Sequence, residues 1–489
     1  MKKMQKKNLF KVLGVFVLEI FVFWGIALTP AAQAASGEWE NVGESILGNN
    51  GAYPTLAFSP LTYEPYVVYR DNTNNWRATV KKFNGSSWSD VGTPGMSYAS
   101  ATYTQIAISN SGDPYVAYRD NARGGKTSVL KYQSSTNWQY VGEETFNDGG
   151  AGYLRLFFKP GTDEPYLAYA DANSGGLAGV KKLNGTSWET VGTPGMGQGA
   201  VSNHLAMAFN PSTKEPYVAF SDTSIFTMAV VKKFNGSDWE TVGNAGFSPA
   251  GIDYIEIAFN PSTYEPYVVF VDETNNENRA TVMKFNGSTW EYVGNPRFSA
   301  GIIFAPSIAF NPTTNEPFIA FGDASYSNKM SVMKWNGSSW EYVRTPGFSA
   351  GGATAGSSFI SDPFTKELFL TFVDGGGSGN SVVVWKNDKT SLSPATVTYK
   401  VKKAKQKIKF TFQDMNFSTK KKNVTLQING KKLKVQSARK SGRNTIASGT
   451  LNYRRWARGS YNATISMKYK IGKTIRTKTW VSQNALTIE

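Results

Sequence analysis

Apolar and polar positions recur along this chain in a unit of about fifty residues. One copy reads IAFNPSTYEPYVVFVD at 257–272 and ATVMKFNGSTWEYVG at 280–294. The run Tyr267–Phe270 is apolar throughout, which predicts a strand buried on both faces, and Pro266 fits the start of that strand. Asn286-Gly287 predicts a tight hairpin because both residues tolerate a positive φ. Each unit therefore predicts four short antiparallel strands.

The unit is repeated seven times. The repeated aspartates are Asp71, Asp120, Asp171, Asp222, Asp272, Asp323 and Asp374, and the repeated tryptophans are Trp39, Trp88, Trp138, Trp188, Trp239, Trp290 and Trp340. Neighbouring copies are separated by 49 to 51 residues. Seven four-stranded units with no helical segment between them predict an all-β fold, a seven-bladed β-propeller.

The two ends of the array are complementary. A lone fourth strand, Trp39–Gly43, precedes the first complete unit, whereas the last unit has a third strand, Ser381–Trp385, and no fourth strand. Pairing of Trp39–Val42 with Val382–Trp385 would leave no blade with an open edge. We therefore expect the N-terminal strand to close the ring.

These motifs resemble the propeller repeats of secreted bacterial proteins, which read roughly Pro-Tyr-Val-Ala-Tyr/Phe-x-Asp and then Lys-x-Asn-Gly-x-x-Trp-x-x-Val-Gly. The resemblance covers about residues 39–388 and implies the fold, without implying an activity. The chain lacks the Ser-x-Asp-x-Gly-x-x-Trp motif of sialidases, the paired glycines of kelch repeats and the Trp-Asp ending of WD40 blades. Those families therefore assign no functional residue here.

Composition narrows the chemistry further. The 489 residues include no cysteine and one histidine, His204, which excludes disulfides, cysteine-ligated zinc and clusters of histidine ligands. The net charge of +16 is uneven, because residues 390–489 carry 23 Lys and Arg against 2 acidic residues. An acidic body with a strongly basic C-terminal segment predicts two separate tasks.

The N-terminal residues have the order of a secretory signal peptide. Five lysines are followed by an apolar run, Val12–Leu28, and by the small-residue cleavage motif Ala32-Gln-Ala34. An uncleaved membrane anchor is the alternative, but Glu19 interrupts a run that is already short for a membrane span. We expect a signal peptide at 1–34, a propeller at 35–389 and a third domain at 390–489. The mature protein would be secreted, extracellular or cell-wall associated, without a transmembrane segment.

Candidate ligand-binding residues lie near the start of each inner strand. The inner strand is the first strand of each unit. The residues three positions before it are Tyr53, Tyr103, Tyr153, His204, Tyr254, Ala305 and Gly356. The residues directly before it are Thr55, Gln105, Arg155, Ala206, Glu256, Ser307 and Ser358. Arg155 and Glu256 are charges that the repeat does not require. Aromatic faces beside polar groups suit a sugar ring, so Tyr53, Tyr103, Tyr153, Arg155, His204, Tyr254 and Glu256 form a candidate carbohydrate site at the mouth of the central channel.

Other interpretations stay open. The tyrosines could only wedge the blades apart and bond the backbone, and His204 could be a simple replacement for tyrosine. The repeated aspartates could bind calcium, but turn capping fits them better because the regular acidic spacing of a calcium loop is missing. Beside a lectin-like role, we consider an enzyme that degrades polysaccharide and a scaffold for protein docking. No catalytic residue, metal or cofactor is assigned.

From Ala395 onward the apolar residues alternate strictly, which predicts about seven strands and an immunoglobulin-like β-sandwich. The outward positions and loops are rich in lysine and arginine, and the candidate polyanion-binding residues are Lys420, Lys421, Lys422, Lys431, Lys432, Arg454 and Arg455. An anionic cell-wall polymer or surface is the expected partner. Nucleic acid is disfavoured because the segment has no interleaved aromatic platform.

Overall fold

The structure, a computed structural model, describes residues 38–43, 47–48, 50–134, 137–147, 149–376, 379–388, 405–412, 424–428, 431–441, 444–452, 459–471 and 474–488. The expected signal peptide lies outside the described residues, as do Lys420, Lys421, Lys422, Arg454 and Arg455. In the described part of the chain, no helix is long and apolar enough to span a bilayer.

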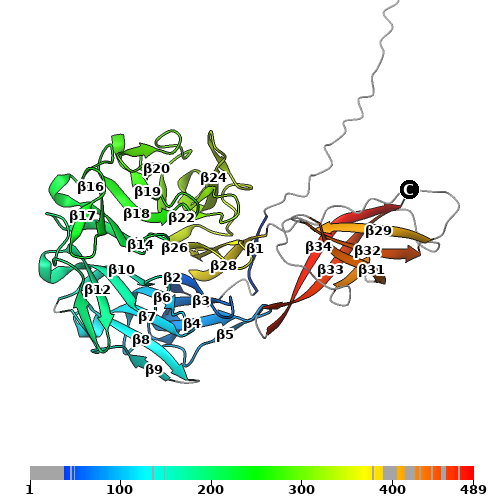
Figure 1. The fold of residues 1–489 in the computed structure, drawn as a ribbon, viewed down its shortest axis with the longest axis horizontal. Coiled ribbons are helices and arrows are strands. Elements are labelled where there is room, and N and C mark those ends of the chain that lie inside the picture. Colours follow the sequence, from blue (N-terminus) through cyan, green and yellow to red (C-terminus); the bar gives the residue numbers. More distant parts are fainter. Residues whose placement is uncertain are drawn as a thin grey trace, which may run out of the picture. The chain divides into compact units, whose positions relative to one another are not determined.

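The described residues between 38 and 388 form seven four-stranded antiparallel sheets, which confirms the predicted seven-bladed propeller (Figure 1). Blades one to three are β2 (Gly51–Phe58), β3 (Pro65–Asp71), β4 (Arg77–Phe83) and β5 (Trp88–Asp90); β6 (Ala101–Ile108), β7 (Pro114–Asp120), β8 (Lys126–Ser134) and β9 (Asn137–Tyr140); β10 (Ala151–Phe158), β11 (Pro165–Asp171), β12 (Leu177–Asn184) and β13 (Ser187–Thr190). Blades four to six are β14 (Val201–Phe209), β15 (Pro216–Asp222), β16 (Met228–Phe234) and β17 (Trp239–Thr241); β18 (Ile252–Phe259), β19 (Pro266–Asp272), β20 (Arg279–Phe285) and β21 (Trp290–Tyr292); β22 (Ile303–Phe310), β23 (Pro317–Asp323), β24 (Lys329–Trp335) and β25 (Trp340–Tyr342).

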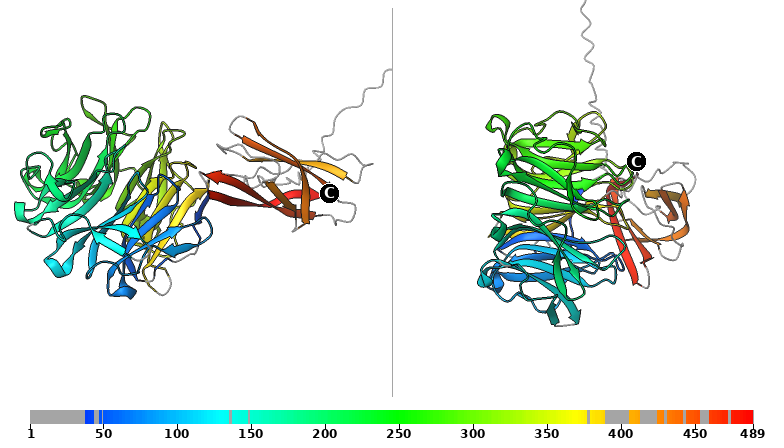
Figure 2. Two further views of the ribbon diagram at one scale, coloured as in Figure 1. Left: turned by 60° about the horizontal axis from the view of Figure 1, so that its bottom comes forward. Right: turned by 60° about the vertical axis from the view of Figure 1, so that its left-hand side comes forward.

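Blade seven combines strands from both ends of this segment. Its sheet contains β26 (Ala353–Ser361), β27 (Leu368–Asp374), β28 (Ser381–Asp388) and, beside β28, the N-terminal strand β1 (Glu38–Asn41). Trp39 lies opposite Asn387 and Asn41 opposite Trp385. The first strands of the seven sheets contact one another in a cycle, β26 touching β2, and they lie toward the centre in Figure 1. The same sheets can be followed from two other sides in Figure 2.

The burial of the strands follows their sequences. The second strand of each blade is mainly apolar, and in β19 all seven residues from Pro266 to Asp272 are buried. This confirms the interpretation of these runs as strands covered on both faces. Apolar side chains fill the space between neighbouring sheets, as where Ile255 and Ile257 of blade five pack with Val231 of blade four. The hydrophobic core is thus divided into layers between the blades.

The inner strands correct one sequence-based expectation. We expected the aromatic residues to precede the inner strands. The inner strands have eight or nine residues and include them. Each strand has a bulge at this point, seen in blade one as a register shift between Ala52 and Thr55. Tyr53 and its counterparts stand in these bulges with left-handed φ values between 43° and 94°. A bulge absorbs an extra residue without ending the strand, so the pattern of apolar residues does not show it.

The repeated aspartates cap the turns that follow the second strands, which confirms that interpretation. These turns lie within the blades and are single 3-10 turns: η1 (Asn72–Asn74), η2 (Asn121–Arg123), η3 (Ala172–Ser174), η4 (Thr223–Ile225), η5 (Thr274–Asn276) and η6 (Ala324–Tyr326). For example, Asp71 Oδ1 accepts hydrogen bonds from Thr73 N at 3.0 Å and from Thr73 Oγ1. Among the described residues, no group of three or more Asp, Glu, His or Cys side chains could hold a metal ion.

The repeated tryptophans join neighbouring blades. Six indole Nε1–H groups donate to a valine carbonyl of the preceding blade: Trp88 to Val42, Trp138 to Val91, Trp188 to Val141, Trp239 to Val191, Trp290 to Val242 and Trp340 to Val293. Their lengths run from 2.6 Å to 3.1 Å. Trp39 differs, because its buried Nε1 has no partner among the residues that the structure describes.

The C-terminal segment forms a six-stranded antiparallel sheet. Its strands are β29 (Lys405–Phe412), β30 (Val424–Ile428), β31 (Lys431–Ser441), β32 (Asn444–Asn452), β33 (Gly459–Ile471) and β34 (Thr474–Ile488). Their order in the sheet is β29-β32-β31-β30-β33-β34. β31 carries Lys431 and the exposed Lys432, and it pairs with β30 through its first residues and with β32 through the rest. Six strands are described where about seven were expected, and the sandwich stays a prediction.

The tryptophan hydrogen bonds give a direct stability test. Trp340→Phe removes the bond to Val293 O and leaves that carbonyl without its partner, so we expect a loss of about 1–2 kcal/mol beyond the loss of packing. Trp39→Phe is the matched control, because it replaces a similarly buried indole whose Nε1 has no described partner. Denaturant unfolding followed by tryptophan fluorescence measures both variants. Equal destabilisation by the two substitutions would contradict the role given to the indole N–H.

Candidate functional site

The first strands of all seven blades line one central cavity of about 670 Å³. Alternate residues of each strand face it, so its wall has an aromatic level, a polar level and an apolar level, as with Tyr153, Arg155 and Phe157 of β10. A volume of this size lies within the range of about 300–1,000 Å³ that small-molecule sites occupy. All seven candidate ligand-binding residues line this cavity.

Five ring side chains from successive blades form a continuous wall at one end of the cavity, which we call the aromatic arc: Tyr53, Tyr103, Tyr153, His204 and Tyr254. Successive ring centroids are 5.4, 5.4, 5.1 and 3.8 Å apart. The last contact, between His204 and Tyr254, is a stack with an interplanar angle of 24°. The equivalent residues of blades six and seven are Ala305 and Gly356, which carry no ring, so the arc ends at Tyr254 and Tyr53.

The arc also has structural contacts. Tyr153 packs against the core between blades three and four, and its hydroxyl donates to Ser202 O at 3.3 Å. Thr104 Oγ1 donates to the carbonyl of Tyr53 at 2.5 Å, which ties the left-handed residue of blade one to blade two. Tyr153 thus bonds backbone and packs between two blades, which is the role that the alternative interpretation gives to these tyrosines. Only their ring faces toward the cavity remain for a ligand.

The two charged residues of the polar level meet across blade four. Arg155 Nη2 lies 2.5 Å from Glu256 Oε1, and the intervening position holds Ala206, whose small side chain leaves room for the contact. Burial raises the pKa of Glu256, and the Arg155 guanidinium opposes that shift. The two charges neutralise each other, and the other polar residues of this level are the uncharged Thr55, Gln105, Ser307 and Ser358. The hydroxyls of Thr55 and Ser358 also bond to the backbone of a neighbouring blade.

His204 is a neutral imidazole in this environment. Burial, and next the nearby charge of Arg155, lower the pKa of His204 to about 3. Its Nδ1 atom is buried and has no hydrogen-bond partner among the described residues. Since buried polar atoms are normally paired, this nitrogen is a hydrogen-bonding position that the described part of the protein leaves unused. It differs from tyrosine in that respect, although it occupies the same place in the repeat.

Two carboxylates near the arc were missed by the sequence analysis. Asp253 precedes Tyr254 in β18, and burial raises the pKa of Asp253. Burial, and next the charge of Asp253, raise the pKa of Glu273. The corresponding positions in the other blades hold no acidic residue, for example Ala52 and Asn72 in blade one. Comparing the seven copies position by position would have found this pair.

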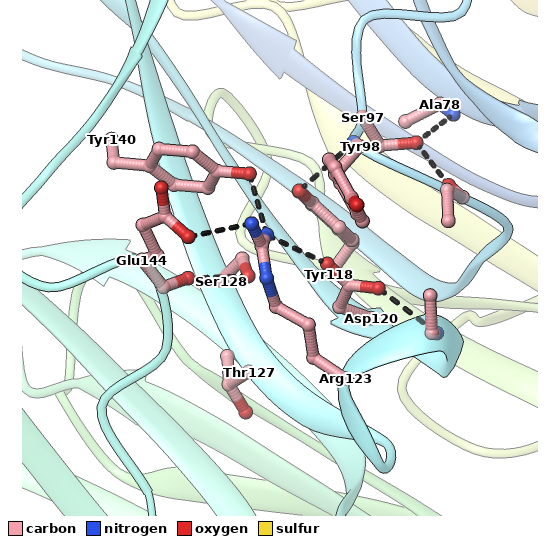
Figure 3. Close-up of polar contacts among 12 residues, drawn as sticks. Ala78, Ser97, Tyr98, Tyr118, Asp120, Arg123, Thr127, Ser128, Tyr140 and Glu144 are labelled. Carbon is pink, nitrogen blue, oxygen red and sulfur yellow. Dashed lines mark hydrogen bonds and ion pairs between the residues drawn. The ribbon is translucent and has the colours of Figure 1, made fainter.

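A second polar cluster was also missed, and it lies at the crossing between blades one and two (Figure 3). The Arg123 guanidinium is 4.2 Å from the ring centroid of the exposed Tyr98 and 5.3 Å from that of Tyr140. It pairs with Asp120 at 3.1 Å and Glu144 at 2.6 Å. None of these residues lines the central cavity. Because two carboxylates neutralise Arg123, we assign it the role of holding this crossing.

Comparison with known proteins identifies the fold. Neither a protein-family model nor a curated protein matches the chain. Among solved structures, the chain is similar to the BP39L lectin from Burkholderia pseudomallei, with 14% identity, a TM-score of 0.51, and coverage of 70% of this chain and 97% of that chain. A puromycin-hydrolyzing peptidase from Mycobacterium tuberculosis has 10% identity and a TM-score of 0.46, covering 75% of this chain and 58% of that one. A protein of unknown function from Dyadobacter fermentans has 10% identity and a TM-score of 0.44, covering 71% of this chain and 98% of that one.

The lowered pKa of His204 predicts a dependence of stability on pH. The unfolded chain binds the proton at a pKa near 6.5 and the folded chain only near 3, so stability falls as the pH drops below about 6.5. Between pH 7 and pH 5 the loss due to this group is about 2 kcal/mol. His204→Tyr, the residue of four other blades, should remove that contribution. Denaturant unfolding of both proteins at pH 7, 6 and 5 measures it, and parallel pH profiles would contradict it.

Proposed function

We propose that the protein binds carbohydrate, in a lectin-like manner, in the central cavity of its propeller. The observation that carries the proposal is the aromatic arc above the uncharged groups of the polar level. A sugar presents apolar C–H faces and a rim of hydroxyl groups, and this cavity offers a surface for each. Aromatic contacts contribute about 0.5–1.5 kcal/mol each beyond the area they bury, so contacts with two or three rings would support specific binding.

The similar Burkholderia pseudomallei protein is a lectin, and that likeness supports the fold alone. The argument for a sugar ligand therefore depends on the cavity of this chain. The repeated positions are the same in most blades, whereas the cavity contains residues that differ between blades, such as Arg155, His204 and Glu256. An enzyme acting on polysaccharide remains the second candidate, because these unlike groups are the type that acid–base catalysis requires.

We further propose the roles of the flanking segments. Residues 1–34 would direct secretion, 35–389 would form the ligand-binding propeller, and 390–489 would form a basic immunoglobulin-like sandwich. The pairing of β1 with β28 would close the ring. The basic residues of the last segment would hold the secreted protein on an anionic wall polymer, since each Lys or Arg near an anionic surface contributes about 1 kcal/mol.

Binding is tested on a glycan and polysaccharide panel with the purified full chain. Tyr153→Gly removes one ring of the arc and suits the left-handed backbone, because φ at this residue is 52°. We expect at least a tenfold loss of affinity, since a ligand contact and its desolvated area disappear. Tyr264→Gly is the matched control, an exposed tyrosine with φ 61° in a turn that does not line the cavity.

The same panel separates the candidate functions. Saturable binding that Tyr153→Gly weakens and Tyr264→Gly preserves would support the lectin-like role. Release of shorter oligosaccharides would favour the enzyme instead. Binding that both variants preserve, or no binding at all, would contradict the proposal for the central cavity.

Elution with increasing salt tests whether the basic segment holds the protein on an anionic surface. We expect the full chain to remain on teichoic acid-bearing cell walls at low ionic strength and to elute well below about 1 M NaCl, where the Debye length is near 3 Å. Replacing Lys420, Lys421 and Lys422 with glutamine should lower the eluting salt concentration. Replacing Lys81, Lys182 and Lys233, which pair with acidic residues on the propeller, serves as the control. Retention that survives about 1 M NaCl would contradict an electrostatic anchor.

A further inference from the structure

The contact between blades six and seven differs from the other contacts between neighbouring blades. In the other six, a glycine follows the valine whose carbonyl accepts the indole bond, and its φ lies between 70° and 80°. A Cβ added at these glycines would lie 2.6 to 3.2 Å from an indole atom of the next blade, which is tighter than ordinary van der Waals contact. The indole bond therefore depends on glycine at this position. The six glycines are Gly43, Gly92, Gly142, Gly192, Gly243 and Gly294.

Arg344 has this position in blade six. Its φ is 80°, equal to that of Gly294 in the preceding blade, although this conformation is unfavourable for a residue with a side chain. By the repeat, the facing indole is that of Trp39 on β1, which should donate to Val343 O. The Cβ of Arg344 would crowd that indole, and the buried Nε1 of Trp39 has no hydrogen-bond partner among the residues that the structure describes. Arg344 thus accounts for the missing indole bond.

The aromatic stacking around Trp39 is also looser. In three other blades the tryptophan stacks on a phenylalanine of the crossing before it, with ring centroids 4.3 to 4.7 Å apart. Trp39 and Phe348 are parallel within 5°, but their centroids are 5.8 Å apart. In the same sheet, the buried Nε1 of Trp385 and Oδ1 of Asn387 have no described partner either. Buried polar atoms without partners are costly, so the outer strands of blade seven are held less firmly.

β1 also differs from the other fourth strands in its connection. In blade one a short turn joins β4, which ends at Phe83, to β5, which begins at Trp88. β1 and its partner β28 come from opposite ends of the propeller segment, so no turn keeps β1 near β28 once their bonds break. Two charged side chains contact β1: Arg344 Nη1 donates to Trp39 O at 2.7 Å, and Lys386 pairs with Glu40 at 2.8 Å.

We propose that β1 is a releasable strap, which leaves β28 while the rest of the propeller stays folded, and that Arg344 favours this release by denying Trp39 its indole bond. The proposal depends on the pairing of β1 with β28 and is independent of what the cavity binds. After release, the hydrophobic core shared by blades seven and one, which includes Val67 and Val373, would connect the two ends of the propeller. A left-handed arginine where six blades use glycine is a strained residue of the type that conformational switches employ.

Hydrogen exchange tests the strap, because seven equivalent amides can be compared. Each of these valine N–H groups donates to a carbonyl of the neighbouring third strand at 2.8 or 2.9 Å, so differences in exchange report opening rather than bond geometry. Mass spectrometry of the full chain with fragmentation measures them. We expect the amide of Val42 on the strap side to exchange at least tenfold faster than the other six. Those are the amides of Val91, Val141, Val191, Val242, Val293 and Val343.

Arg344→Gly restores the residue of the other six contacts. We expect it to slow exchange at Val42 at least threefold, since Trp39 can then donate to Val343 O. Arg297→Gly is the matched control, because Arg297 is also a left-handed arginine, with φ 54°, and lies in the crossing after blade five. It should leave exchange at Val42 unchanged.

A cross-link tests the same opening without changing Arg344. The chain has no cysteine, and Glu40 lies opposite Lys386, so the double variant Glu40→Cys and Lys386→Cys can form a single disulfide between β1 and β28. In its oxidised form we expect Val42 to exchange as slowly as the other six valines. The reduced form of the same variant is the control and should exchange at least as fast as the original protein.

The outcomes decide the proposal. Fast exchange at Val42 that Arg344→Gly and the disulfide both slow, with Arg297→Gly without effect, supports a strap controlled by Arg344. Equal exchange at all seven valines in the original protein overturns it. Fast exchange that persists in the oxidised variant places the opening elsewhere and also overturns it. Fast exchange that Arg344→Gly leaves unchanged overturns the role given to Arg344.

Discussion

The left-handed residue in the bulge of every inner strand is the constraint on which the site depends. In a residue other than glycine the left-handed conformation costs roughly 1–2 kcal/mol. Six of the seven bulges hold a residue other than glycine in this conformation. The sheet pairing on either side of each bulge holds the backbone in place, as where Ala52 and Thr55 both pair with β3. The bulge directs the side chain toward the centre, so seven local distortions together create a ring of seven positions, five of which the aromatic arc occupies.

The symmetry of the repeats separates structural residues from candidate functional residues. Capping aspartates and tryptophans joining neighbouring blades recur from blade to blade, because each blade has the same turns and the same neighbours. The cavity has a similar backbone in every blade but different side chains, including the pair of Arg155 and Glu256 and the small Ala305 in place of a ring. A repeated framework needs no such differences. The residues that differ between blades are therefore the candidates for ligand binding.

The sequence predicts the blades well because an apolar second strand and a fixed turn recur at a constant interval. It also predicts that the N-terminal strand pairs with β28, although the observed register, with Asn41 opposite Trp385, is displaced by two residues. The bulges, the contact of Arg155 with Glu256 above Ala206, and the cluster around Arg123 are not visible in the pattern. Each depends on a single residue, or on the distance between separate blades, and such features leave the periodicity of apolar residues unchanged.

The most direct measurement of the central claim is a crystal structure of the full chain with a bound neutral methyl glycoside. The account predicts electron density for one sugar ring inside the central cavity, with its apolar face on a ring of the aromatic arc. Density for the sugar at another place, such as beside Tyr98 and Arg123, with none in the cavity, would contradict it.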